Sequence, residues 1–131
     1  MKLKGLDGKE YNVSVIPKQN TNASKNHLNI RDLLKEMYPY EIVVEEFKIP
    51  GTRLFCDFFL PSKKLVIEVH GEQHYTYNPH FFKSKKDFYQ AKARDNTKEE
   101  WVLVNKFELL VLSYKEKMDE CRAKIIDRLT D

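Results

Sequence analysis

The sequence predicts an α/β protein with one mixed sheet flanked by helices. The expected order is an αβββαβ core with an N-terminal β-hairpin extension and a C-terminal helix. Two observations support this class. Short runs rich in Phe, Val, Ile and Leu, of strand length, alternate with longer segments whose apolar residues recur at helical spacing. The central runs are also apolar on both faces, which requires cover on both sides of the sheet.

The first 23 residues are predicted to form the hairpin extension and a loop. Asp7-Gly8 is a turn dipeptide at the hairpin tip, and residues 11–15 alternate as a return strand. A polar loop follows, and Ser24 is expected to cap the first helix. Residues 24–131 then form a single α/β domain.

Capping residues, turn residues and the spacing of apolar residues indicate where the remaining helices and strands begin and end. Pro39 ends the first helix, and Pro50-Gly51 turns the chain into a central hairpin. Helices are predicted over residues 25–37, from 84 or 87 to 104, and over 115–129, and strands over 41–48, 54–60, 65–69 and 107–113. The last helix is expected to face the core with Met118, Cys121, Ile125, Ile126 and Leu129.

The central hairpin carries one acid in each strand where an apolar residue is expected. A turn over residues 61–64 places Asp57 directly opposite Glu68, where Cβ atoms lie roughly 4.5–5.5 Å apart. Two carboxylates so close in an apolar sheet need a cation or a shared proton. Because strand side chains alternate, His70 is expected on the same face as Glu68.

The composition is that of a soluble globular protein. The chain has 131 residues, 41% hydrophobic and 33% charged, with a net charge of +3, which fits one domain and excludes a disordered chain. No run approaches the length of a membrane span and the start has no signal core, so we expect an intracellular, cytoplasmic protein without a membrane partner. Cys56 and Cys121 lack zinc spacing and are predicted to be reduced thiols.

A basic run follows the acids, comprising Lys83, Lys85, Lys86, Lys92, Arg94 and Lys98. Such a run is usually a solvated helix face, but beside a metal-type site it can hold phosphates. His27 and His80 are predicted to be ordinary surface residues. The aromatic residues of the preceding loop either stack on bases or pack the loop onto the sheet, and they are Tyr75, Tyr77, Phe81 and Phe82.

Several short motifs occur in a fixed order: Pro50-Gly51, Asp57-Phe58, Pro61, the run Val66-Ile67-Glu68-Val69-His70-Gly71, Gln73-His74, Arg94-Asp95 and the final strand. Together with the element order, they resemble the PD-(D/E)XK, or restriction-endonuclease-like, nuclease superfamily. The closer resemblance is to its branch of very-short-patch repair endonucleases. It covers about residues 24–115.

The resemblance implies a metal site and proton-transfer groups. Asp57 and Glu68 would be metal ligands, helped by the carbonyl of Val69, and such hard oxygens suit Mg²⁺ or Mn²⁺. His70 stands where the superfamily usually has a lysine. By the resemblance, His70 and His74 would transfer protons to or from the attacking water and the leaving group. Gln73 would orient His70 or a water, and the identity of the general base stays open. The family's first-helix acid stays open, because Glu36 is near the end of that helix and position 27, near its start, is a histidine.

The resulting hypothesis is a metal-dependent DNA endonuclease that nicks or cuts both strands, alone or as a homodimer or larger complex. Its phosphate contacts would come from Lys85, Lys86, Lys92, Arg94 and Lys98. One alternative is a catalytically silent nuclease-fold module that binds nucleic acid or a protein partner. Another is a metal-binding protein that is not a nuclease.

Overall fold

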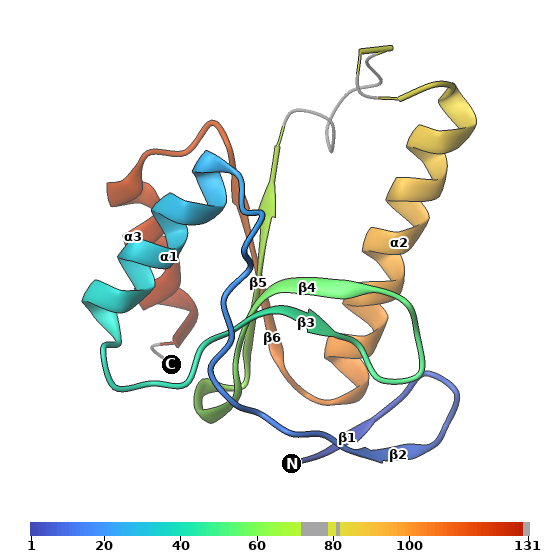
Figure 1. Cartoon of the computed structure of the whole chain (residues 1–131), viewed down its shortest axis with the longest axis horizontal. Helices are drawn as coiled ribbons and strands as arrows, with labels where there is room; N and C mark the ends of the chain where they lie inside the picture. Colours follow the sequence, from blue (N-terminus) through green and yellow to red (C-terminus); the bar gives the residue numbers. More distant parts are fainter. Residues whose placement is uncertain (72–78, 81, 130–131) are drawn as a thin grey trace.

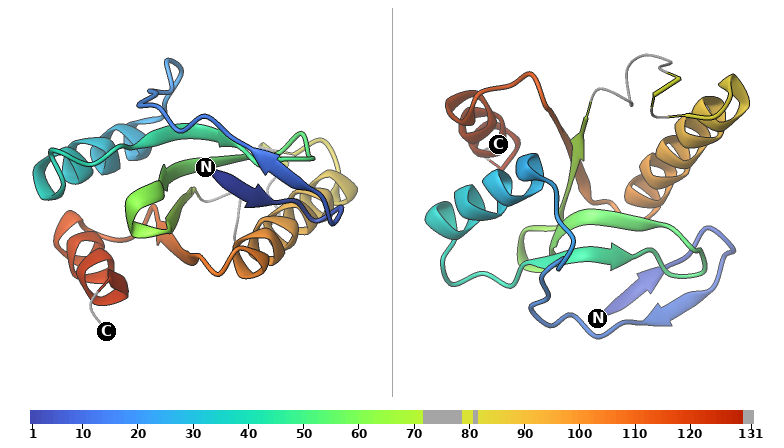
Figure 2. Two further views of the ribbon diagram at one scale, coloured as in Figure 1. Left: turned by 90° about the horizontal axis from the view of Figure 1, so that it is seen from below. Right: turned by 45° about the horizontal axis from the view of Figure 1, so that its top comes forward.

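A computed structural model describes residues 1–71, 79–80 and 82–129 of the chain. They form a mixed α/β fold in which α1 and α3 lie on one side of a four-stranded sheet and α2 on the other (Figure 1 and Figure 2). The elements are β1 (Lys2–Lys4), β2 (Glu10–Asn12), α1 (Lys25–Met37), β3 (Val44–Lys48), β4 (Phe55–Leu60), β5 (Leu65–His70), α2 (Lys85–Val104), β6 (Glu108–Ser113) and α3 (Met118–Leu129). The mixed sheet, its flanking helices and the N-terminal hairpin were all expected from the sequence.

The sheet has the strand order β3-β4-β5-β6. The first two pairings are antiparallel and β5 pairs with β6 in parallel, so the connection through α2 crosses from one strand to its parallel neighbour. A 3₁₀ turn, Pro61–Lys63, joins β4 to β5 and ends with Lys64 in the left-handed region at φ 52°. The chain thereby reverses within the four residues that the sequence indicated.

The predicted register of β4 and β5 is confirmed near the turn and wrong at the acids. Leu60 pairs with Leu65, and the pairing continues outward to Phe58↔Ile67, where it ends. Asp57 and Glu68 are not ladder partners, because each side chain accepts a backbone N–H from the opposite strand. The carboxylates therefore take the place of backbone hydrogen bonds at this end of the hairpin.

A local shift in β3 and β4 accompanies the end of the ladder. Glu46 has φ 50°, in the left-handed region, and lies at the level of Asp57 between two regular pairs. At this level the regular alternation of side chains between the two faces of the sheet is interrupted in both strands. Residues three positions apart consequently pack in the same core cluster, as Val44 does with Phe47 and Cys56 with Phe59.

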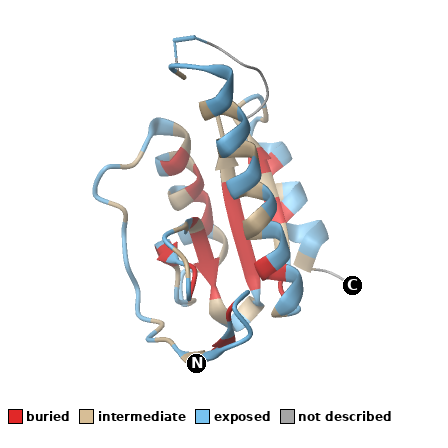
Figure 3. Ribbon diagram, turned by 90° about the vertical axis from the view of Figure 1, so that its right-hand side faces the viewer, coloured by how far each residue is buried: buried red, intermediate tan, exposed pale blue. Residues whose placement is uncertain are grey.

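Two apolar clusters fill the space on either side of the sheet. The cluster facing α1 and α3 includes Phe58, Ile67 and Leu110, all nearly inaccessible to solvent. The cluster facing α2 includes Phe59 and Val66 and extends to Trp101, Val102 and Phe107. Figure 3 shows the buried positions along the central strands and the exposed outer face of α2. Two-sided cover accounts for the apolar sequences of the central strands.

The N-terminal hairpin packs onto the C-terminal end of α2 (Figure 1). Leu3 is buried in the cluster facing α2. The carbonyl of Lys4 accepts hydrogen bonds from Trp101 Nε1 and Asn105 Nδ2, both at 2.9 Å. The return strand is shorter than predicted, since β2 ends at Asn12. The hairpin thus closes the lower edge of that cluster.

The helices begin largely where the sequence predicts. Ser24 caps α1, its Oγ accepting the N–H of His27 at 3.2 Å. The last helix starts at Met118 rather than near residue 115. Met118 and Ile126 are exposed, in contrast to the prediction, and Cys121 and Ile125 alone of its described side chains are buried.

Two further features of the described residues bear on the sequence predictions. Cys56 and Cys121 are buried free thiols, as predicted. None of the helices in the described part of the chain is long and apolar enough to span a membrane.

Candidate active site

The two acids of the central hairpin meet where the ladder between β4 and β5 ends. The N–H of Asp57 donates to Glu68 Oε2 at 2.9 Å, and the N–H of Val69 donates to Asp57 Oδ2 at 2.8 Å. Glu68 is only 3% exposed, whereas Asp57 is half-buried. The structure therefore brings the predicted acid pair together, through side-chain to backbone contacts rather than through strand pairing.

Lys98 reaches the acid pair from α2. Its Nζ lies 2.7 Å from Glu68 Oε1, and its side chain is 18% exposed. That Lys98 binds phosphate stays a prediction, and in the structure the lysine pairs with the buried Glu68 carboxylate. A sequence signal existed: Lys98 precedes the buried residues Trp101 and Val102 by three and four positions, so it shares their side of the helix.

The electrostatics of the pair leave one negative charge uncompensated. Burial and the nearby charge of Asp57 raise the pKa of Glu68 to about 7, although Lys98 acts in the opposite direction. Burial alone would lower the pKa of Lys98, but the two carboxylates raise it overall. Two acids facing one ammonium group form a site that gains stability from an added proton or an added cation.

The donor atoms fit a hard divalent cation better than a soft one. The site offers carboxylate oxygens, and in the described residues Asp57 Oδ1 accepts no hydrogen bond. No three His, Cys, Asp or Glu side chains of the described residues are arranged to hold a metal ion. A metal shell built from the described residues would accordingly rest on two carboxylates and main-chain oxygen, without a third side chain.

The remaining predicted catalytic residues follow Glu68 along the chain. Val69 packs its side chain against the cluster facing α1 and α3, so only its main chain is turned to the acids. His70 is half-buried at the end of β5, and its carbonyl accepts the N–H of Tyr114 at 2.8 Å. Gln73 and His74 lie outside the described residues.

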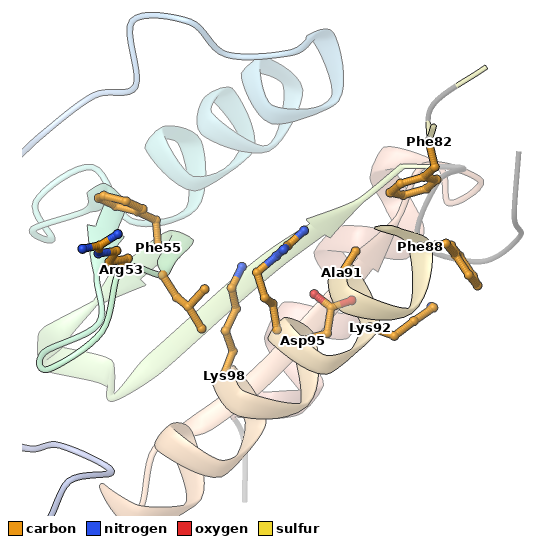
Figure 4. Close-up of a pocket in the computed structure, with 10 residues that line it drawn as sticks. Arg53, Phe55, Phe82, Phe88, Ala91, Lys92, Asp95 and Lys98 are labelled. Carbon is orange, nitrogen blue, oxygen red and sulfur yellow. The ribbon is translucent and has the colours of Figure 1, made fainter. Parts of the chain in front are cut away.

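A cavity of about 380 Å³ opens beside the acid pair, between the start of β4 and α2 (Figure 4). Of the predicted phosphate-binding residues, Lys92, Arg94 and Lys98 line it, while Lys85 and Lys86 do not. Arg53 also lines it and was missed in the sequence, because a single arginine in a turn carries no periodic signal. The residues that line the cavity come from the start of β4 and from α2, which are far apart in the sequence.

A second buried acid lies on the opposite face of the sheet. Glu45 Oε1 accepts hydrogen bonds from His27 Nε2 and Arg31 Nη2, and its Oε2 accepts one from Arg31 Nε, all at 2.7 Å. The prediction that His27 is a surface residue is wrong: it is 4% exposed, and its ring stacks on Phe58 at 4.2 Å between centroids. Helical spacing places His27 and Arg31 on one face of α1.

The pKa of Glu45 shifts in the opposite direction to that of Glu68. Burial by itself would raise this pKa, but hydrogen bonds from Arg31, from the N–H of Asn20 and from His27 outweigh burial and lower it. Glu45 is therefore a charged, fully partnered group that holds α1 onto the sheet. Its contacts indicate a structural role.

The fold and these contacts define a mixed α/β protein with a carboxylate pair on the two central strands of its sheet, one acid buried and the other half-buried. No protein-family model and no solved structure matches the chain. Over 64 residues the chain is 36% identical to "Uncharacterized protein 307L" of Invertebrate iridescent virus 6. The match covers 49% of this chain, and the chain spans 32% of the length of the viral protein. That protein's name states no activity.

Proposed function

We propose that the chain is a divalent-metal-dependent DNA endonuclease of the PD-(D/E)XK type, which hydrolyses phosphodiester bonds. The observation that carries this proposal is the pair formed by Asp57 and the buried Glu68, contacted by Lys98 beside a cation-lined cavity. A carboxylate with a pKa raised to about 7 at the edge of a cavity is typical of reactive sites.

Asp57 and Glu68, with the carbonyl of Val69, would hold Mg²⁺ or Mn²⁺. Such an ion supplies Lewis acidity toward a phosphate oxygen and lowers the pKa of a bound water. Lys98 would then be released from Glu68 and donate a hydrogen bond to the scissile phosphate. His70, on the same strand as Glu68, is proposed to transfer a proton at its imidazole.

The cations of the cavity would hold the substrate backbone. Arg53 and Arg94 are exposed side chains that line the cavity, one from each wall, and Lys92 lies on the same helix as Arg94. Guanidinium groups bind phosphate through paired hydrogen bonds. Their placement beside Lys98 supports a phosphodiester substrate.

The test is cleavage of supercoiled plasmid with Mg²⁺ or Mn²⁺. We expect metal-dependent cleavage that falls by more than ~100-fold in both Asp57→Asn and Glu68→Gln, since loss of a residue that only supports a metal ligand already costs about 10- to 100-fold. The matched control is Glu108→Gln, whose side chain is 56% exposed and pairs with Arg128 on the other face of the sheet. Cleavage that persists in both variants, or proceeds equally in EDTA, contradicts the proposal.

One observation favours a second candidate, a nuclease-fold module that binds nucleic acid without cleaving it. In the part of the chain that the structure describes, no group of three metal-binding side chains is present. This candidate predicts salt-sensitive DNA binding with no cleavage by the wild-type protein in either metal. The plasmid assay combined with a binding assay separates the two candidates.

A further inference from the structure

We propose that the cavity between β4 and α2 binds one unpaired nucleobase, so that the preferred substrate is single-stranded at the point of contact. The link to cleavage rests on the proposed function. Binding of the base itself requires only the cavity. The substrate class that follows is a strand with an unpaired nucleotide, such as single-stranded DNA or a flap.

The cavity is lined by aromatic rings on more than one side. Figure 4 shows Phe55 at the β4 side and Phe82 and Phe88 at the α2 side, with Lys98 between them. Phe55 is 42% exposed, although it begins a core strand. Phe82 and Phe88 contact each other edge to face at 5.5 Å between centroids. Phe82 and Phe88 are half-buried, and Lys92 Nζ lies over the Phe88 ring at 5.7 Å from its centroid, so Phe55 is the exposed ring of the cavity. Aromatic rings that border a cationic groove are the usual platform for single-stranded nucleic acid.

The charges around the rings favour a nucleotide over an uncharged ligand. Four cations line the cavity against one acid, Asp95. Two of these cations, Arg53 and Arg94, make no ion pair or hydrogen bond with the described residues. A phosphate group can therefore bind them without displacing another carboxylate. The combination of rings and free guanidinium groups matches a base joined to its phosphate.

The space available suits one base and excludes a base pair in its stack. At about 380 Å³ the cavity is at the lower end of the ~300–1,000 Å³ that small-molecule sites occupy. Ala91 keeps the helix wall between Phe88 and Asp95 small. Bases in a duplex are stacked on their neighbours, so a ring in a side cavity can contact only a base that has left the stack.

The cavity and the acid pair share one residue. Lys98 lines the cavity, and its Nζ lies 2.7 Å from Glu68 Oε1. A nucleotide whose base enters the cavity would therefore place its phosphate beside the carboxylates. This arrangement connects selection of an unpaired base with the position of cleavage.

The test measures binding in EDTA, where the metal-dependent reaction is absent. Three fluorescent ligands of equal length are compared: a thymidine oligonucleotide, an abasic strand with the same phosphates, and a duplex. We expect the thymidine strand to bind about 5-fold to 150-fold more tightly than the abasic strand, the range for one stacked base. Phe55→Leu should remove most of this difference.

The matched control is Tyr40→Leu, because Tyr40 is a 99% exposed aromatic residue between α1 and β3 that does not line the cavity. Circular dichroism melting shows whether each variant is folded. Equal binding of thymidine and abasic strands, or an unchanged preference in folded Phe55→Leu, overturns the inference. A second result would also overturn it: the duplex binds more tightly than the thymidine strand, and Phe55→Leu has no effect. That result would indicate a surface that binds phosphates only.

The two proposals fail in different assays. Base-dependent binding that needs Phe55, with no plasmid cleavage in either metal, supports the cavity and contradicts the nuclease. Metal-dependent cleavage that needs Asp57, with no preference for bases over abasic sites, does the reverse. In an active protein, Phe55→Leu should raise KM for a single-stranded substrate more than it lowers kcat.

Discussion

Glu45 and Glu68 are both almost inaccessible to solvent, at 2% and 3% exposure, on opposite faces of the same sheet, yet their pKa values shift in opposite directions. Glu45 faces Arg31 and His27, while Glu68 shares one lysine with a second carboxylate. Burial acts to raise both pKa values and Glu68 lies deeper in the protein, so the depth of burial and the partners together decide the direction of each shift. A buried acid with an excess of donors is a charged, fully partnered group, whereas one beside another acid holds its proton more tightly.

The two faces of the sheet also differ in how completely helices cover them. Against one face, α1 and α3 enclose the apolar cluster together with the Glu45 contacts. On the other face, only Trp101 and Val102 of the described α2 side chains are buried, and the N-terminal half of the helix borders the cavity instead. The cavity therefore lies where α2 no longer packs directly on the sheet.

The largest expected difference is in stability after neutralising each acid. Glu45→Gln should lower the free energy of unfolding by about 3 to 5 kcal/mol, because Arg31 and His27 lose the partner of their buried contacts. Glu68→Gln should be neutral or stabilising at pH 7, since it removes repulsion from Asp57. Urea denaturation measures both values, and equal destabilisation by the two substitutions would contradict the comparison.

The next difference is in the pH range over which each acid affects stability. A raised pKa means that the folded state holds the proton more tightly, so the free energy of unfolding should fall as pH rises from 4.5 to about 7. At about 1.4 kcal/mol per pKa unit, Glu68 contributes a fall of about 3 kcal/mol, which Glu68→Gln should abolish.

Glu45 should act in the opposite sense and at lower pH. Its lowered pKa contributes stability that is fully present above 4.5 and is lost as pH falls through the folded-state value. Urea titrations in EDTA between pH 3 and pH 8, compared among wild type, Glu45→Gln and Glu68→Gln, assign each range. If Glu68→Gln leaves the slope between pH 5 and pH 7 unchanged, the difference between the two acids is not one of protonation.

The smallest expected effect is stabilisation by the metal. Mg²⁺ at ten times its dissociation constant should raise the free energy of unfolding by about 1.4 kcal/mol. Asp57→Asn should abolish this increase and Glu45→Gln should retain it, because the proposed ligands lie on one face only. Urea denaturation in Mg²⁺ and in EDTA is the measurement. The same increase in Asp57→Asn would place the ion elsewhere.

Local patterns allowed most of the fold to be predicted. Apolar spacing located the helices and strands, and Ser24 and the Pro61 turn fixed two boundaries because caps and turns depend on neighbouring residues. The end of the β4–β5 ladder at Asp57 was not predictable, since it depends on the contacts of both carboxylates with the backbone of the opposite strand. Strand defects of this kind leave no alternation signal of their own.

The candidate site was predictable only as far as it lies within one hairpin. Asp57 and Glu68 were found because both occupy apolar strands separated by a short turn. The contact of Lys98 with Glu68, and the burial of His27, depend on how helices distant in sequence pack on the sheet. Periodicity shows which side of a helix is covered, but it does not show which strand residue lies beneath each position.

The attachment of the N-terminal hairpin also constrains the order of events during synthesis. Lys4 is bound by Trp101 and Asn105, which follow it by 97 and 101 positions. Because a ribosome releases the N-terminus first, the hairpin must wait for most of the chain before its contacts can form. The cluster facing α2 is consequently completed late, and contacts of such long sequence separation slow folding.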